Sequence, residues 1–208
     1  MKTNIFTTKE ELNKMWIRAK NACRTTVNKE HTENEPKDSF KIKLLLSEHS
    51  PIRLIKVNWI WDSIKSWISV HFSRSSWECF ISTQRTDRTG IDRDELKQSE
   101  LVAFEGEMNA QNKIDTARKR LCYQSSKETR EHMEDFKIAL NEIDESLAFV
   151  MVPNCIYRCG CPEFEQCSFW GDIIKKYPSI VSGSIRKRYE IYNEYFYNRR
   201  KINDNINW

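Results

Sequence analysis

The sequence has little glycine and little proline, with five residues of each among 208. This scarcity excludes collagen-like and low-complexity chains, in which these residues dominate. The chain also lacks any apolar run near the roughly 18 residues of a membrane-spanning helix, and its first residues lack the apolar segment of a secretory signal peptide. We therefore expect a soluble, cytoplasmic protein.

Neither sign of charge dominates the chain, because 34 basic residues face 30 acidic ones and leave a net charge of +4. Nucleic-acid-binding domains are usually more basic, so the balance favours a small phosphorylated ligand in a local basic pocket. Aromatic residues are plentiful at 12%, and apolar residues reach 39%. A chain of this length and composition can bury the hydrophobic core of one domain.

Apolar spacing and capping residues predict the first elements. Residues from Thr8 to Lys20 have the pattern of an amphipathic helix with Thr8 as its N-cap. Residues 52 to 61 alternate between apolar and polar and predict a strand. Asp62-Ser63 then predicts the cap of a further helix. From 93 to 144 glycine and proline are almost absent, which predicts two helices joined near Tyr123 to Ser126.

The C-terminal part predicts a Cys-rich loop from Cys155 to Cys167 and an aromatic, basic helix around 185 to 201. Aromatic side chains among basic ones can stack on bases, but this spacing favours a helix packed on the body or on a subunit neighbour. We therefore predict an α/β (α+β) fold with a twisted sheet flanked by long helices. A single domain over 1–170 is expected to precede a helical extension over 171–208.

Several polar residues stand where the predicted elements end. They are His49, Arg74, Arg85, Arg93, Asn109 and Arg120. Arginine suits bidentate recognition of phosphate, although no Gly-rich phosphate loop is present. On the residues alone, a nucleotide pocket and a set of solvated surface arginines both remain open.

An ordered series of motifs between Ser47 and Arg130 resembles the flavin-dependent thymidylate synthases. The matching motifs are Glu48-His49, Arg74, Thr83-Gln84-Arg85, Arg93-Asp94-Glu95-Leu96, Asn109-Ala110 through Asp115 to Arg120-Leu121, and Glu128-Thr129-Arg130. Their order and separations carry the resemblance, since each motif alone is weak.

This resemblance implies a methyltransferase that converts dUMP, or a related pyrimidine monophosphate, with methylenetetrahydrofolate as carbon donor, FAD as hydride carrier and NADPH as reductant. It also implies a homotetramer with active sites at subunit interfaces. The implied substrate-binding residues are Thr83, Gln84, Arg85, Arg93 and Arg120, with Arg120 also catalytic. The implied cofactor-binding residues are His49, Arg74, Asn109 and Asp115.

Two alternatives remain open. Ser75-Ser76 stands in place of the His and second Arg of the family signature, which favours a catalytically degenerate homologue that binds a nucleotide without flavin chemistry. Cys155, Cys159, Cys161 and Cys167 could form a zinc or iron–sulfur site, but their spacing matches no common metal motif, so we predict no metal. With the basic tail, such a site would instead indicate a nucleic-acid-binding protein.

The implied oligomer gives a first prediction. Light scattering at micromolar concentration should return a multiple of the 24.9 kDa chain mass, because the shared active site needs more than one copy. The mass of a single chain would contradict the tetramer.

Overall fold

The computed structural model describes residues 3–206, with side chains as far as residue 200. Its sheet has four antiparallel strands in the order β1-β2-β4-β3. The strands are β1 (Asn4–Ile5), β2 (Lys56–Lys65), β3 (Glu78–Ile81) and β4 (Leu101–Asn109). The fold is therefore α+β, and the α/β alternative within the prediction is wrong, because no strands run parallel in the described chain.

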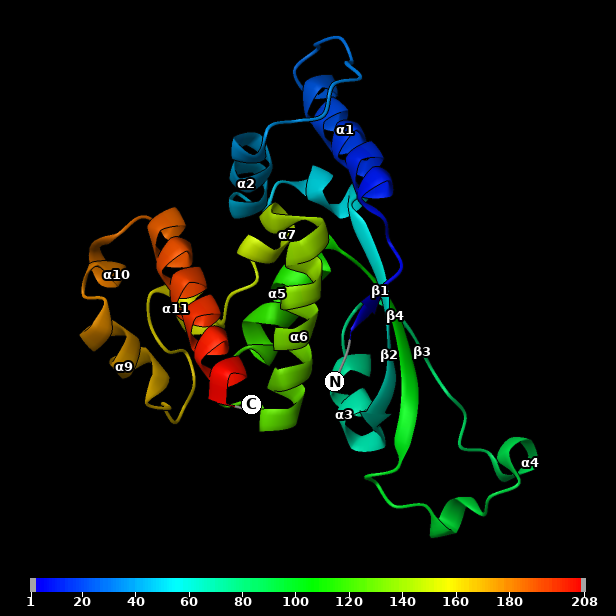
Figure 1. Cartoon of the computed structure of the whole chain (residues 1–208). Helices are drawn as coiled ribbons and strands as arrows, with labels where there is room; N and C mark the ends of the chain where they lie inside the picture. Colours follow the sequence, from blue (N-terminus) through cyan, green and yellow to red (C-terminus); the bar gives the residue numbers. More distant parts are fainter. Residues whose placement is uncertain (1–2, 207–208) are drawn as a thin grey trace.

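The helices fall into groups by their place around the sheet (Figure 1). The N-terminal group is α1 (Lys9–Thr25), α2 (Asp38–Leu46) and the 3-10 helix η1 (Ser50–Leu54). The helices that follow the strands are α3 (Ser66–Ser73), α5 (Ala110–Arg120), α6 (Lys127–Ile143), α7 (Glu145–Phe149) and α8 (Asn154–Arg158). The C-terminal group is α9 (Phe169–Lys176), α10 (Ser179–Ser182) and α11 (Ile185–Ile206). The long connection from β3 to β4 carries α4 (Thr86–Thr89) and the 3-10 helix η2 (Arg93–Glu95).

Helix α1 begins where the sequence predicts. Thr8 accepts a hydrogen bond from the Glu11 backbone N–H, and the Glu11 carboxylate accepts one from the Thr8 N–H at 2.7 Å. This reciprocal capping box satisfies two N–H groups that a helix start otherwise leaves free. The helix continues to Thr25, five residues beyond the predicted end.

Strand β2 confirms the predicted alternation from Lys56 to Trp61, but residues 52 to 54 of the predicted strand belong to the 3-10 helix η1. The strand also continues through Asp62 and Ser63. Val57, Trp59 and Trp61 face inward and are buried. The β2–β4 register shifts between Trp61 and Ile64, so the strand contains a bulge there. The bulge returns Ile64 to the buried face, and the predicted helix cap at Asp62-Ser63 is wrong. Helix α3 begins only at Ser66.

The predicted helix over residues 93 to 144 is wrong in its first part. Strand β4 occupies 101 to 109, with Val102, Phe104 and Met108 buried on its inner face. Glu105 and Glu107 lie on the other face of this strand. Glutamate favours helices over strands, so the composition of the segment predicted a helix. The predicted joint is confirmed, because α5 ends at Arg120 and α6 begins at Lys127.

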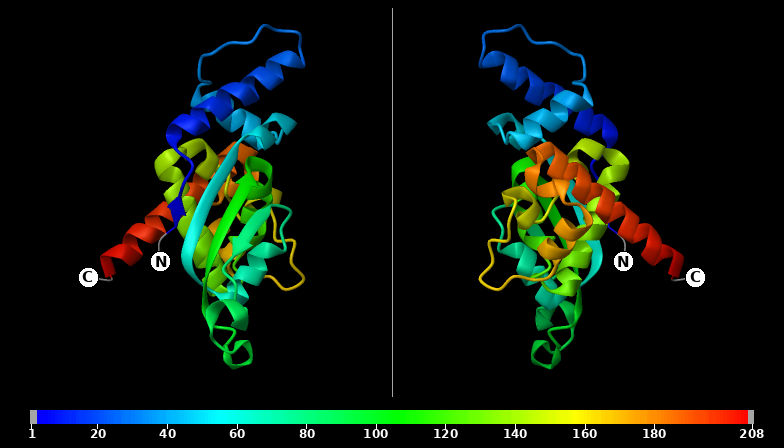
Figure 2. Two further views of the ribbon diagram at one scale, coloured as in Figure 1. Left: turned by 90° about the vertical axis from the view of Figure 1, so that its right-hand side faces the viewer. Right: turned by 90° about the vertical axis from the view of Figure 1, so that its left-hand side faces the viewer.

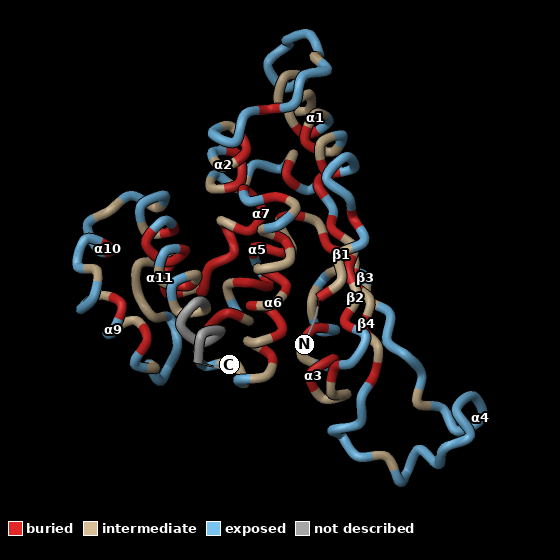
Figure 3. The backbone as a smooth tube through the Cα atoms, viewed as in Figure 1, coloured by how far each residue is buried: buried red, intermediate tan, exposed pale blue. Residues whose placement is uncertain are grey.

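The core lies between the inner face of the sheet and the helices (Figure 3). The Trp59 ring lies 4.8 Å from Phe136 of α6, measured between centroids, and the Trp61 ring lies 5.3 Å from His132. The aromatic side chains of α11 extend this core, since Tyr189 and Phe196 are buried. The expectation that this helix packs on the body is confirmed, and its buried rings are not free to stack on bases.

The opposite face of the sheet carries no helix over most of its area (Figure 2). From the far end of the β3–β4 hairpin, residues 82 to 100 project away from the body (Figure 1). Nearly all of these residues are exposed. No helix in the described range is long and apolar enough to cross a membrane.

Two lysines are fully buried in the helical layer. Lys137 donates to Ala148 O at 2.6 Å, Met151 O at 3.1 Å and Asn193 Oδ1 at 2.7 Å. Lys113 is equally buried, but its Nζ has no hydrogen-bond partner among the described side chains and backbone. Burial lowers the pKa of Lys113 to about 7, against the opposing charge of Asp144.

Lys113 therefore predicts a pH dependence of stability. Between pH 7 and 10 the unfolded chain binds a proton at Lys113 that the folded chain does not, so this lysine makes stability rise with pH. Lys113→Met should raise the free energy of unfolding by about 1–3 kcal/mol at pH 7, and the gain should shrink toward pH 9.5.

Urea unfolding of the wild type and the variant at several pH values measures this difference. Lys119→Met, at an exposed position of the same helix, is the matched control. An equal gain at every pH would mean that Lys113 keeps its ordinary pKa.

Candidate functional site

A hollow of about 350 Å³ opens between the end of α3 and the outer side of α5. We call it the arginine hollow. Its lining residues are Arg74, Ser75, Ser76, Trp77, Asn112, Asp115, Thr116, Lys119 and Arg120. The size suits part of a nucleotide.

Three cations dominate the arginine hollow. Arg120 Nη2 donates to the carbonyl oxygen of His71, and burial followed by the charge of Arg74 lowers the pKa of Arg120. Among the side chains that the structure describes, no carboxylate lies within ion-pair distance of Arg74, Lys119 or Arg120. Cations left close together without a counter-charge form a site for an anion.

The local structure explains why two of these cations stand together. Lys119 and Arg120 are in the last turn of α5, where the helix dipole favours positive charge. Arg74 caps the C-terminal end of α3. His71 of the same helix shares a hydrogen bond of 2.9 Å between its Nδ1 and Thr129 Oγ1, and burial together with Arg120 and Arg74 lowers its pKa.

A second hollow of about 330 Å³ adjoins the first and shares Lys119 and Arg120 with it. We call it the amide hollow. Its other lining residues are Cys122, Gln124, Ser125, Asn154 and Glu163. They come from the α5–α6 joint, from the start of α8 and from the loop before α9, so residues 119–125 and 154–163 line one hollow although they are distant in the sequence.

The structure places Arg74, Asp115 and Arg120 of the predicted site residues around one hollow. Asp115 does not neutralise the cations there, because its carboxylate lies 3.2 Å from Arg118 Nη1. Arg118 is held in turn by the carboxylate of Glu48 and stacks over Tyr157 at 3.5 Å from the ring centroid. Glu48 is thus a structural partner of α5.

The other predicted site residues lie elsewhere in this chain. Asn109 is the N-cap of α5, with its side chain accepting from Asn112 N at 2.9 Å, and His49 is exposed before η1. Thr83, Gln84, Arg85 and Arg93 lie in the projecting segment, where Arg85 forms a bidentate pair with Asp87. Their predicted roles in binding remain predictions.

Lys119 and the whole amide hollow were not predicted from the sequence. The basic run from Arg118 to Arg120 contained a signal for Lys119, because adjacent basic residues at a helix end point to different sides of the helix. Ser125 and Asn154 carried no signal, since their proximity depends on how α8 packs against α5.

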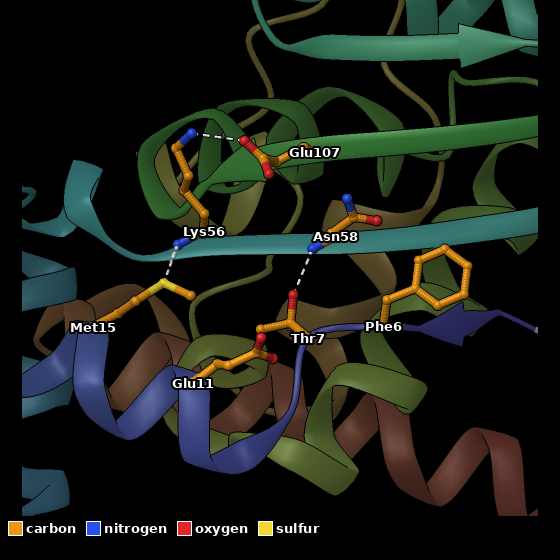
Figure 4. Close-up of a pocket in the computed structure, with 7 residues that line it drawn as sticks. All are labelled: Phe6, Thr7, Glu11, Met15, Lys56, Asn58 and Glu107. Atoms are coloured by element: carbon orange, nitrogen blue, oxygen red, sulfur yellow. Dashed lines mark hydrogen bonds and ion pairs between the residues drawn. The ribbon is translucent and has the colours of Figure 1, made fainter.

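A third hollow, of about 330 Å³, lies where α1 meets the edge of the sheet (Figure 4). Its cation is neutralised, because Lys56 Nζ lies 2.7 Å from Glu107 Oε1. Thr7 accepts a hydrogen bond of 2.8 Å from Asn58 N. Asn58 Oδ1 has no partner among the described residues, but without a free cation this hollow does not suit a phosphate.

The four cysteines between Cys155 and Cys167 differ in burial, since Cys155 is buried and the other three are half-buried. Cys159 Sγ donates to Val181 O at 3.6 Å, and burial, followed by the nearby thiols of Cys122, Cys161 and Cys167, raises the pKa of Cys155 to about 12. Within residues 3–200, no three His, Cys, Asp or Glu side chains have the geometry of a metal site.

Comparison with known proteins gives a structural likeness and no sequence match. No family model and no curated protein sequence matches the chain. The fold is similar to that of the UMP/dUMP methylase PolB from Streptomyces cacaoi, whose crystal structure contains 5-Br dUMP. The TM-score is 0.51 at 10% identity, over 71% of this chain and 93% of the methylase.

This likeness corrects the assignment to the flavin-dependent thymidylate synthases. The similar structure is that of a UMP/dUMP methylase, and no family model supports the motif series. Short motifs of charged residues occur readily in a chain that is 31% charged, which explains how the series arose. The chain has a mixed α+β fold that is similar to that of the methylase.

Proposed function

We propose that the chain binds a pyrimidine nucleoside monophosphate and methylates its base, with the phosphate in the arginine hollow. The observation that carries this proposal is the cluster of Arg74, Lys119 and Arg120, which lack carboxylate partners among the described residues. The likeness to a UMP/dUMP methylase supports the pyrimidine nucleotide as the substrate class.

The cations explain why a monophosphate fits. Guanidinium groups bind phosphate through paired N–H donors. A dianion between Arg74 and Arg120 offsets both the burial and the charge of Arg74 that lower the pKa of Arg120. A neutral nucleoside offers no such gain. The hollow should therefore discriminate strongly between dUMP and uridine.

The cofactors expected from the sequence, FAD, NADPH and methylenetetrahydrofolate, remain predictions. Of the residues expected to hold the cofactor, Arg74 and Asp115 line the arginine hollow, whereas His49 and Asn109 do not. The proposed function therefore covers the substrate class and the methylation of the base, whichever carbon donor is used.

Nucleotide binding should be visible as thermal stabilisation. A ligand present at 100 times its Kd stabilises the native state by about 2.7 kcal/mol, which corresponds to a Tm increase of about 5–10 °C for a chain of this size. We expect this shift with dUMP and none with uridine. Arg74→Gln and Arg120→Gln should each remove most of it.

Arg93→Ala is the matched control for the loss of one arginine. It should keep the shift, because Arg93 lies in the projecting segment. If Arg93→Ala alone lost the shift, phosphate binding in the arginine hollow would be contradicted. Binding by Arg85 and Arg93, which the family resemblance implies, would then be favoured.

Methylation should release tritium from dUMP labelled at C5, because the new methyl group replaces that hydrogen whichever donor supplies it. Arg120→Lys keeps the charge and loses the forked donor. The variant should lose about 2–4 kcal/mol of transition-state stabilisation, the scale of one preorganised donor. Wild-type protein that binds dUMP and releases no tritium would support the non-catalytic alternative instead.

A further inference from the structure

Phe164 is fully exposed to solvent in the loop that joins α8 to α9. Its exposed fraction is 109%, whereas the next most exposed large apolar side chain of the described residues, Phe80, reaches 66%. An aromatic side chain gains free energy when it leaves water. The ring of Phe164 therefore has a favourable contact still to make.

The loop that carries this ring is held firmly at its ends and weakly in its middle. At one end Gly160 N donates to Cys155 O at 3.0 Å. At the other end the buried ring of Phe169 stacks on Tyr123, with 4.5 Å between the ring centroids. Between these ends, residues 162–166 are exposed and form no backbone–backbone hydrogen bond with the described chain. A segment with so few hydrogen bonds can change its position without unfolding the helices beside it.

The middle of this loop lies at the rim of the amide hollow. Glu163 lines that hollow. Gln124, which also lines it, donates from Nε2 to Glu165 O at 2.7 Å, and this is the one hydrogen bond between residues 162–166 and the rest of the described chain. Phe164 is thus flanked on both sides by residues in contact with the hollow or its lining. Figure 2 shows the loop in yellow at the edge of the body.

The amide hollow lacks the apolar surface that a flat ring needs. Among its lining residues only Cys122 is apolar, and the others are charged, amide or hydroxyl side chains. Ligand pockets are usually lined by apolar and aromatic side chains with a small number of polar groups. The polar hollow and the exposed aromatic ring beside it therefore complement each other.

We propose that residues 161–167 form a lid that closes over the amide hollow when the nucleotide binds, with the ring of Phe164 lying on the ligand. This inference rests on the proposed function, because the phosphate in the arginine hollow holds the rest of the nucleotide at the boundary that the two hollows share, Lys119 and Arg120. Closure buries the Phe164 ring. It also excludes water from the ligand, which strengthens the electrostatic interactions inside the site.

Digestion with chymotrypsin tests the closure, because this protease cuts after phenylalanine in exposed segments. In the free protein the bond after Phe164 should be cut early. Saturating dUMP should slow this cut at least about tenfold, since cleavage follows the population of the open segment, and uridine should not slow it. Trypsin cleavage after Arg88, in the projecting segment, is the control. It should keep its rate, because that segment lines neither hollow.

Calorimetric titration of Phe164→Ala tests the contact with the ligand. The side chain is fully exposed, so its removal should leave the fold intact. The variant should bind dUMP at least about fivefold more weakly, the lower end of the range for one aromatic ring on a base. Inorganic phosphate, which needs the arginine hollow alone, should bind as to the wild type. Phe164→Tyr should bind dUMP normally, and Phe6→Ala, at another exposed phenylalanine, is the matched control.

The outcomes separate the lid from the function on which it rests. If dUMP raises the Tm but leaves the cut after Phe164 at its original rate, or if Phe164→Ala binds dUMP as tightly as the wild type, the lid is overturned while nucleotide binding stands. Equal protection at Phe164 and Arg88 would also overturn it, because the protection would then come from the stability of the whole fold. If dUMP neither raises the Tm nor binds in the calorimeter, both proposals fail.

Discussion

The contact between Trp59 and Gly106 is the constraint on which the rest of the structure depends. A Cβ atom at position 106 would lie 2.4 Å from Cη2 of Trp59 and 2.9 Å from Cζ3 of Trp77. Only glycine lets the two indole rings lie directly on β4. Trp59 in turn packs against Phe136 of α6, so one position without a side chain sets how closely the sheet and the helical layer approach.

Trp77 connects this contact to the candidate site. Trp77 lies between the core and the arginine hollow, and its hydrogen bond to Thr116 joins the segment after α3 to α5. Arg74 precedes Trp77 by three residues, while Lys119 and Arg120 follow Thr116 on the helix. The separation of these cations is therefore set by aromatic packing, which can hold like charges together against their repulsion.

Local signals in the sequence predicted local structure well. Thr8 marked the start of α1, the alternation of Trp59 and Trp61 marked a strand, and the α5–α6 joint lay where expected. Strand β4 was missed because Glu105 and Glu107 on its outer face are typical of a helical composition, and the bulge after Trp61 depends on pairing with β4. Sequence reasoning predicted Arg74 and Arg120 as site residues, since arginine has a phosphate-binding chemistry of its own. Ser125 and Asn154 acquire their character only when separate elements pack together.

The segment between β3 and β4 is a place where insertions and cuts should have little effect on the fold. Residues 82 to 100 contribute almost nothing to the core, and the strands that flank them pair directly with each other. The entropy of closing such a loop changes slowly with its length, and exposed segments of this kind accept insertions and cuts. Gln98 O and Glu100 O accept from the first residues of α3, so a peptide tag, a second domain or new termini placed near α4 would leave the helices that form the two hollows undisturbed.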